Sequence, residues 1–146
     1  MAETFPLDPA NDVHARALAR LREERIGWLG TIGRDGYPHA VPVWFLWHGD
    51  EVLTFSQPTA AKVRNLRRDP RAMFHLEAGA DGEQLQVLQG DARISERSTG
   101  EWMAEVEDAY RAKYTAGLRH LGWNLQRIVD DYSTAILLRP HRMIAW

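Results

Sequence analysis

The 146-residue sequence contains no cysteine, which excludes disulfide bonds, thiolate metal sites and a cysteine nucleophile. No apolar run approaches the ~20 residues that a helix needs to cross a bilayer. Residues 1–12 are acidic and lack the apolar stretch of a signal peptide. A net charge of −2 leaves no basic excess for binding nucleic acid. We therefore expect a cytoplasmic protein with neither a membrane nor a nucleic-acid partner.

Motifs for several common chemistries are also absent. Gly27, Gly30, Gly33 and Gly36 do not match G-x-G-x-x-G, and they fall in a strand and a hairpin turn, not ahead of a helix. The six histidines show no metal-binding spacing such as H-E-x-x-H. Ser56 lies in no G-x-S-x-G elbow. We expect no metal site, and no side chain stands out as a catalytic acid, base or nucleophile.

What the sequence does contain is an ordinary globular composition with six tryptophans. Its length predicts one domain over residues 1–146, large enough to bury a core. Tryptophan is favoured where a large apolar area meets a polar partner, as in pockets and interfaces. The tryptophans therefore indicate a binding site or a subunit contact.

The apolar patterns predict a mainly β protein with flanking helices. Six strands in hairpin order favour a small antiparallel barrel, and they are expected at residues 26–32, 38–47, 52–56, 72–76, 85–94 and 132–138. Gly90 is expected to form a bulge. Pro140 is expected to break the last strand, with residues 143–146 as a short extension.

Helices are expected on the outside of this barrel. Asp8 or Asn11 can cap a first helix, and Ser95 or Ser98 can cap a later one that runs towards Tyr114. Residues 118–129 form either a further helix or a broken continuation. Residues 77–83 are rich in glycine and acids and read as a loop.

The strand at residues 38–47 is apolar on both faces. One face carries Val41, Val43 and Phe45, and the other carries Pro42, Trp44 and Leu46. Pro42 lacks a backbone N–H and therefore favours an edge, a bulge or a free N–H side. A strand buried on both sides needs the core on one face and a ligand or a second subunit on the other.

A short basic helix opens at residues 57–59, directly after the strand that ends at Ser56. Free N–H groups and the helix dipole make such a helix start an anion site. Ser56 and Thr59 add hydroxyl groups. Lys62 adds a cation in the first turn, where the dipole disfavours it unless an anion binds. Arg64 is a second candidate contact, whereas Arg67 and Arg68 read as a solvated face. These features predict a phosphate-binding corner beside an apolar floor, as a flavin-like cofactor requires.

The segments TIGRDGYPHAVPVWFLW, LTFSQPTAAKVRNLRRDPRA, VLQGDARI and YSTAILLRPHRMIAW resemble the pyridoxamine 5'-phosphate oxidase-like split barrels. Within these, they are most similar to the oxidoreductases of actinobacterial type that depend on the deazaflavin coenzyme F420. The resemblance runs from Ile26 to the end of the chain. The block from Lys62 to Arg71 is its most specific part.

The resemblance implies a homodimer of six-stranded Greek-key barrels with two cofactor sites at the subunit interface. The cofactor ring would lie along Val41, Pro42, Val43 and Trp44. The ribityl and phosphate path would be lined by Ser56, Gln57, Thr59, Ala60 and Ala61, with Lys62 on the phosphate. Gln84 and Leu85 would reach the cofactor of the other subunit. Some relatives carry arginine where this chain has Ala60, so Arg64 is a candidate to supply that contact.

His39 is the histidine closest in sequence to this region, and both a ligand contact and a hydrogen-bonded strand histidine remain open for it. The implied activity is hydride transfer between F420 and a flat conjugated small molecule such as biliverdin, a quinone or an enone. FMN is the alternative cofactor. A non-catalytic module that binds a flavin, heme or a fatty acid is the alternative function.

Overall fold

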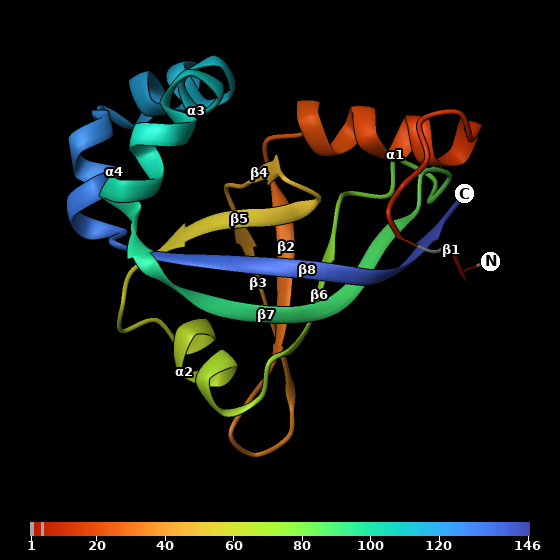
Figure 1. Ribbon diagram of the computed structural model, residues 1–146, viewed down its shortest axis with the longest axis horizontal. Helices are drawn as coiled ribbons and strands as arrows, with labels where there is room; N and C mark the ends of the chain where they lie inside the picture. Colours follow the sequence, from red (N-terminus) through yellow and green to blue (C-terminus); the bar gives the residue numbers. More distant parts are fainter. Residues whose placement is uncertain (1, 4) are drawn as a thin grey trace.

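The computed structural model describes residues 2–3 and 5–146 of the chain. Its core is a curled antiparallel sheet with helices at both ends and on one side (Figure 1). None of the helices in this described part is long and apolar enough to span a membrane.

The sheet runs in the order β3-β2-β6-β7-β8-β5-β4, and β1 pairs with β8 outside this path. The strands are β1 Ala2–Glu3, β2 Gly27–Ile32, β3 Pro38–Val43, β4 Leu46–His48, β5 Glu51–Ser56, β6 Arg71–His75, β7 Gln86–Ser98 and β8 Thr134–Ala145. The two strands at the ends of this order, β3 and β4, follow one another directly in the chain. The sheet therefore curls so that its two edges meet at the connection between them. The predicted number of six strands is wrong, since seven form the main path.

The extra strand arises because the predicted strand at residues 38–47 is interrupted at Trp44 and Phe45. The backbone N–H of Phe45 donates to the hydroxyl of Tyr114, 2.7 Å away, and not to a neighbouring strand. The sequence of the strand carries no turn residue at this point. A contact made 69 residues further along the chain ends β3 and redirects β4. Pro42 does lie on an edge strand, as predicted.

The predicted break at Pro140 is also wrong, because β8 runs through it to Ala145. Pro140 stands opposite Gly90 on β7, where the pairing register shifts between Gln89 and Gly90. A bulge does lie at the Gly90 position, as predicted, but its extra residue is His141 on β8, because Gln89 pairs with Arg142 and Gly90 with Pro140. The bulge absorbs the missing N–H of the proline, so that a strand with an internal proline stays paired.

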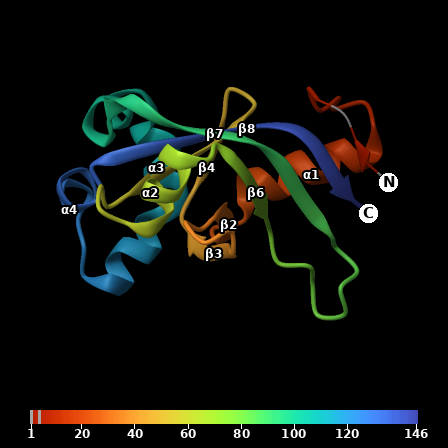
Figure 2. The ribbon, with the colours of Figure 1, turned by 90° about the horizontal axis from the view of Figure 1, so that it is seen from below.

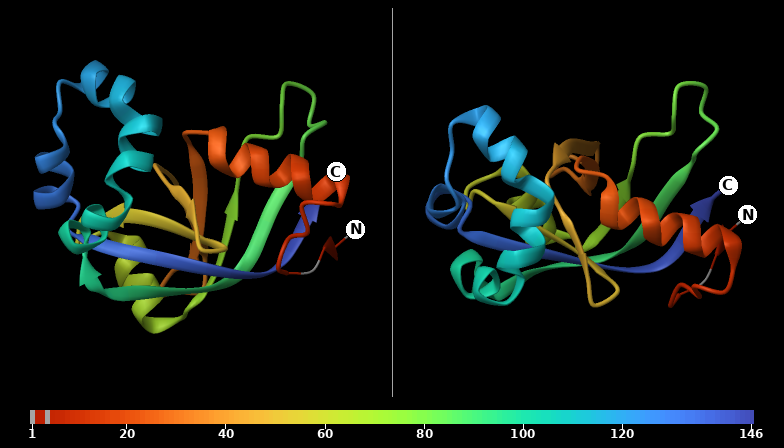
Figure 3. Two further views of the ribbon diagram at one scale, coloured as in Figure 1. Left: turned by 45° about the horizontal axis from the view of Figure 1, so that its top comes forward. Right: turned by 90° about the horizontal axis from the view of Figure 1, so that it is seen from above.

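The helices are α1 Asp12–Glu23, α2 Ala61–Arg68, α3 Thr99–Leu121 and α4 Leu125–Asp131. Asn11 caps α1, and Ser98 caps α3 in a capping box with Glu101. Seen from other directions, α1 lies at one end of the long strands β7 and β8, and α3 with α4 lies at the other (Figures 2 and 3). The expected helix ending near Tyr114 continues to Leu121, and residues 122–124 separate it from α4.

Two hydrophobic clusters hold these layers together. The first fills the barrel and includes Leu29, Phe74 and Leu88, all fully buried. The second joins the outside of β4, β5 and β8 to α3 and α4. Strands β5 and β8 are therefore buried on both faces, with Leu53 and Leu137 facing the helices. The loop at residues 77–83 follows β6, as predicted.

Candidate functional site

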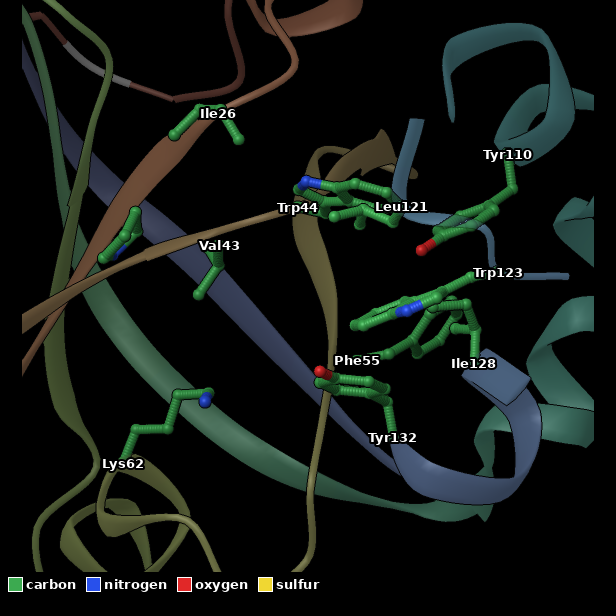
Figure 4. Close-up of a pocket in the computed structure, with 11 residues that line it drawn as sticks. Ile26, Val43, Trp44, Phe55, Lys62, Tyr110, Leu121, Trp123, Ile128 and Tyr132 are labelled. Atoms are coloured by element: carbon green, nitrogen blue, oxygen red, sulfur yellow. The ribbon is translucent and has the colours of Figure 1, made fainter. Parts of the chain in front are cut away.

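A cavity of about 300 Å³ lies where the β3–β4 bend, β5 and the start of α2 face α3 and α4. Its walls are almost entirely apolar and aromatic (Figure 4). They comprise Ile26, Pro42, Val43, Trp44, Phe55, Lys62, Tyr110, Leu121, Trp123, Ile128 and Tyr132. Its volume lies at the lower end of the range for small-molecule sites in proteins.

Aromatic rings form one half of this cavity. The Trp44 ring stacks on Tyr114 with 4.5 Å between centroids and 6° between planes. Tyr110 lies 4.9 Å from Tyr114 and 5.7 Å from Phe55. A Cβ atom on Gly117 would stand 3.1 Å from the Trp44 ring, so the glycine gives the indole room against α3. A continuous aromatic wall thus runs from β3 along α3 to β5.

Trp123 and Tyr132 line the cavity as well, and their rings lie 5.9 Å apart. Trp123 lies in the short connection between α3 and α4, and Tyr132 follows directly after α4. Ile26 and Leu121, which are 39% and 46% exposed, are two further apolar residues of its lining. The flat, apolar character of this half suits a conjugated ring.

Lys62 is the charged residue of the lining, and its ammonium group points into the cavity opposite the aromatic residues (Figure 4). Burial lowers the pKa of Lys62 below its ordinary value. Among the described residues no carboxylate forms an ion pair with it. A half-buried cation without a counter-ion is an incomplete arrangement that a bound anion would satisfy.

At the N-terminus of α2, too, hydrogen-bond donors lack recorded partners among the described residues. Ala60 is the N-cap residue and offers no side-chain acceptor, and the first turn of the helix carries no acidic residue. In the described part of the chain, the structure records no acceptor for the backbone N–H groups of Ala61 and Lys62. The first turn of this helix therefore carries two N–H groups without a recorded acceptor among the described residues and one ammonium group, a donor set suited in kind to phosphate.

The structure brings together four of the residues predicted from the sequence, since Pro42, Val43, Trp44 and Lys62 all line the cavity. The neighbouring residues of the β5–α2 turn lie beside it without lining it. The hydroxyl of buried Ser56 donates to the carbonyl of Gln57, 2.9 Å away, so it is already engaged within the protein. Arg64 folds back to donate to the carbonyl of Thr59.

Val41 does not line the cavity and packs against the barrel core. His39 lies in a separate groove of about 430 Å³ across β3, β2, β6 and β7, and its buried Nδ1 atom has no partner there. Gln84 and Leu85 line another groove beside α1, where the carbonyl of Gln84 accepts from Arg20 at 2.7 Å. Within one chain these residues do not join the cavity of Lys62.

The sequence model of the pyridoxamine 5'-phosphate oxidase family matches residues 13–146, which takes in every residue of the cavity. The chain belongs to this family. The recognition drawn from the four sequence segments is therefore confirmed.

Solved structures of other proteins share the fold. A conserved hypothetical protein from Mycobacterium tuberculosis is 27% identical, with a TM-score of 0.69 over 90% of this chain and 82% of that one. An F420 reductase is 20% identical, with a TM-score of 0.65 over 86% and 94% of the two chains. The heme storage protein from Vibrio cholerae is 16% identical, with a TM-score of 0.64 over 89% and 92%. The same fold thus serves different ligands.

Seven of the eleven residues that line the cavity were not among the predicted site residues, namely Ile26, Phe55, Tyr110, Leu121, Trp123, Ile128 and Tyr132. Tyr110 lies on the buried side of α3, but residue spacing along a helix does not show which way its hydroxyl points. Trp123 and Tyr132 lie at the ends of helices, where residue spacing gives no direction. The unusual number of tryptophans indicated a binding site without locating this half of it.

Two neighbouring residues of α3 hold the bend that presents Trp44. The hydroxyl of Tyr114 accepts from the Phe45 N–H and lies within donating distance of two carbonyls, Arg25 at 2.7 Å and Phe45 at 2.9 Å. The ammonium of Lys113 donates to the carbonyls of Phe45 at 3.0 Å and Leu21 at 3.3 Å. The bend is therefore fixed by α3, and β3 alone does not determine it.

These buried groups predict how stability depends on pH. Burial lowers the pKa of Lys113 from 10.5 to about 8, so between these values the unfolded chain binds a proton that the folded protein does not. The free energy of unfolding should then rise with pH across this interval. Burial also raises the pKa values of Tyr110 and Tyr114 above 10, so the unfolded chain loses protons first and stability should fall above pH 10.

Urea unfolding at a series of pH values between 7.5 and 11 checks both limbs. In Lys113→Met the rise of the unfolding free energy with pH should shrink to the part contributed by Lys62. The fall of the unfolding free energy above pH 10 should persist. A rising limb of unchanged size in this variant would show that Lys113 keeps its ordinary pKa in the folded protein.

Proposed function

We propose that this protein is an oxidoreductase that binds coenzyme F420 and transfers a hydride between it and a flat conjugated small molecule. The observation that carries the proposal is the position of Lys62. Its ammonium group, which has no ion-pair partner among the described residues, lies at one end of an aromatic cavity, and it belongs to the first turn of α2, whose N–H groups would complete an anion site. An anionic phosphate attached to a planar ring has that same division into a charged and a flat apolar part.

The residues present fit this cofactor in kind. Lys62, with the N–H groups of Ala61 and Lys62, would hold the phosphate, and the turn from Ser56 to Ala60 would follow the ribityl chain. Pro42, Val43 and Trp44 would lie along the ring. The deazaflavin supplies the hydride chemistry when bound. The protein contributes orientation, exclusion of water by the aromatic wall, and electrostatic support for the phosphate.

FMN carries a similar tricyclic ring and a phosphate, and it is the alternative cofactor. F420 continues beyond its phosphate into an anionic tail, and exposed cations such as Arg64 and Arg68 lie on the helix that begins at the phosphate site. Contacts to such a tail would be solvated and would weaken with salt. The relation to an F420 reductase of the same fold agrees with this choice.

Heme is the second candidate ligand because a heme storage protein shares the fold. Heme iron in proteins takes an axial ligand such as histidine, methionine, cysteine or tyrosine. The described lining of the Lys62 cavity holds no histidine or methionine. Among the residue types that can ligate heme iron, this lining offers only tyrosine, at Tyr110 and Tyr132. Tyrosine is therefore the axial ligand that binding of heme in this cavity would require.

Titration with F420, FMN and heme tests the proposal directly. Each ligand has its own absorbance spectrum, so binding and identity can be followed in one experiment. The titrations should be made at two ionic strengths. They should be followed by single-turnover oxidation of reduced F420 with biliverdin, a quinone and an enone. Tighter binding of FMN, together with no oxidation of F420 by any acceptor, would overturn the choice of cofactor.

We also propose a homodimer with one cofactor site at each end of its interface. Strand β3 is an edge strand, and the groove around His39 leaves Ile32 and Met73 accessible next to the unpartnered His39 Nδ1. In the apolar segment at residues 143–146, Met143 and Ala145 are buried in their own subunit, whereas Trp146 is 62% exposed. In such a dimer, His39, Gln84 or Leu85 could approach the cofactor of the partner.

Sedimentation velocity should show this dimer at micromolar concentration, because an obligate interface should bury upwards of ~2,000 Å². Introducing a charge at the groove, as in Met73→Glu, should shift the protein towards monomers. The matched variant Met103→Leu, inside the helical cluster, should remain dimeric. A wild-type protein that sediments as a stable monomer would remove the interface from the proposal.

A further inference from the structure

Two hydroxyl groups in the cavity have no partner within the described protein. Tyr110 is only 3% exposed, yet its hydroxyl makes no recorded hydrogen bond with a described residue, and neither does that of Tyr132. Figure 4 shows both hydroxyls directed into the cavity. By contrast, the hydroxyl of neighbouring Tyr114 is held by the backbone of Arg25 and Phe45. Both hydroxyls face the open space of the cavity, so a ligand atom is the natural partner for this pair.

Tyr110 also has a defined protonation state. Burial raises the pKa of Tyr110 above its ordinary value, and the proximity of Tyr132 raises it further. The Tyr110 phenol therefore remains protonated at neutral pH, and both hydroxyl groups can act as O–H donors. A ligand that satisfies them must offer an acceptor, such as a carbonyl oxygen.

The surroundings restrict the rest of that ligand to a flat apolar body. Phe55 and Trp123 flank the two tyrosines with ring centroids 5.7 Å and 5.9 Å away, respectively, and Ile128 closes the slot. These ring pairs pack on one another and together present an apolar aromatic surface, against which a planar ring packs well.

Among the described residues, no cation lines this half of the cavity. Lys62 lies at the opposite end, where the proposed phosphate binds. Arg127 stacks on Trp123 with its guanidinium 4.3 Å from the ring centroid, but it is paired with Asp131 at 3.4 Å and does not line the cavity. A ligand with carboxylates would therefore bury charge without compensation.

We infer that the aromatic half of the cavity is a subsite for an uncharged quinone or enone, whose carbonyl oxygen accepts hydrogen bonds from Tyr110 and Tyr132. Only the role of this molecule as the hydride acceptor rests on the proposed function. The subsite separates the candidate acceptors, because it favours a neutral quinone or enone over biliverdin, which carries carboxylates.

The test measures binding by equilibrium dialysis to the purified protein without added cofactor. The first probe is 2,3-dimethyl-1,4-naphthoquinone, and the second is 2,3-dimethylnaphthalene, which has the same rings without the oxygens. Each tyrosine hydroxyl that bonds the quinone should contribute roughly two- to tenfold in affinity. Tyr110→Phe and Tyr132→Phe should each weaken quinone binding by this factor and leave binding of the hydrocarbon unchanged.

Tyr37→Phe is the matched control, because Tyr37 is 73% exposed and lies outside the cavity, and it should change neither affinity. Tyr132→Phe keeps the experiment decisive if Tyr110→Phe lowers the stability of the core, since Tyr132 is only half-buried. Quinone affinities equal to wild type in both phenylalanine variants would overturn the assignment of the donors.

Two further binding experiments test whether the subsite prefers uncharged molecules and whether it is distinct from the cofactor site. In Lys62→Met, whose cavity lining has lost its cation, a sulfonated 1,4-naphthoquinone should bind more weakly than the neutral quinone, and equal binding would overturn the preference for uncharged molecules. Saturation with oxidised F420 should leave the neutral quinone bound. Its displacement would show that the aromatic half holds the cofactor ring. Tyrosine-dependent quinone binding in a protein that binds no F420 would support the subsite and reject the proposed function.

Discussion

Replacing Lys62 by alanine should weaken F420 binding about ten- to a hundredfold, because one charge-assisted hydrogen bond to the phosphate is lost. The free energy of unfolding of the cofactor-free protein should stay the same or increase. In that state the ammonium is half-buried without a counter-ion, and burial already lowers its pKa. Titration of the fluorescence of the deazaflavin measures the affinity, and urea unfolding measures the stability.

Arg67→Ala is the matched control, since Arg67 is an exposed cation of the same helix and does not line the cavity. It should leave the affinity nearly unchanged. Binding should also weaken as pH rises through the lowered pKa of Lys62, and this pH dependence should vanish in Lys62→Ala. Equal affinities of the alanine variant and the wild type would place the phosphate elsewhere.

The parts of the fold that follow from local pattern were predictable. The bulge at Gly90, the edge position of Pro42 and the caps at Asn11 and Ser98 all depend on the conformational preferences of single residues. The break between β3 and β4 does not. It depends on the hydroxyl of Tyr114, which competes for the backbone of Phe45 from a distant helix, and nothing in the sequence of residues 38–47 signals it.

The same limit applies to the site. Lys62 was predictable because a cation in the first turn of a helix conflicts with the helix dipole, and the structure indeed leaves it without a counter-ion among the described residues. Trp123 and Tyr132 enter the cavity only because α4 turns back along α3 towards β8. Their contribution depends on helix packing, which the spacing of residues within one helix does not determine.

Replacing Gly90 by alanine should produce the largest loss of stability that we predict, about 3 kcal/mol, with the thermal midpoint lowered by roughly 10 °C. A Cβ atom there would stand 2.0 Å from the carbonyl oxygen of Arg139 and 2.8 Å from the Cα atom of Pro140. Both are backbone atoms of β8, so relief requires the two longest strands to separate at the bulge. Thermal unfolding followed by circular dichroism measures the effect.

Gly100→Ala is the control for this substitution, because Gly100 lies in the first turn of α3 and its added Cβ atom would meet only a side-chain atom of Val129 at 3.3 Å. The gain in helix propensity of about 1 kcal/mol should offset that small adjustment, so the midpoint should change little or rise. The loss in Gly90→Ala should also reach the cavity, since β8 begins two residues after Tyr132. A wild-type midpoint in Gly90→Ala would mean that β8 passes Pro140 without the close approach that keeps it paired to β7.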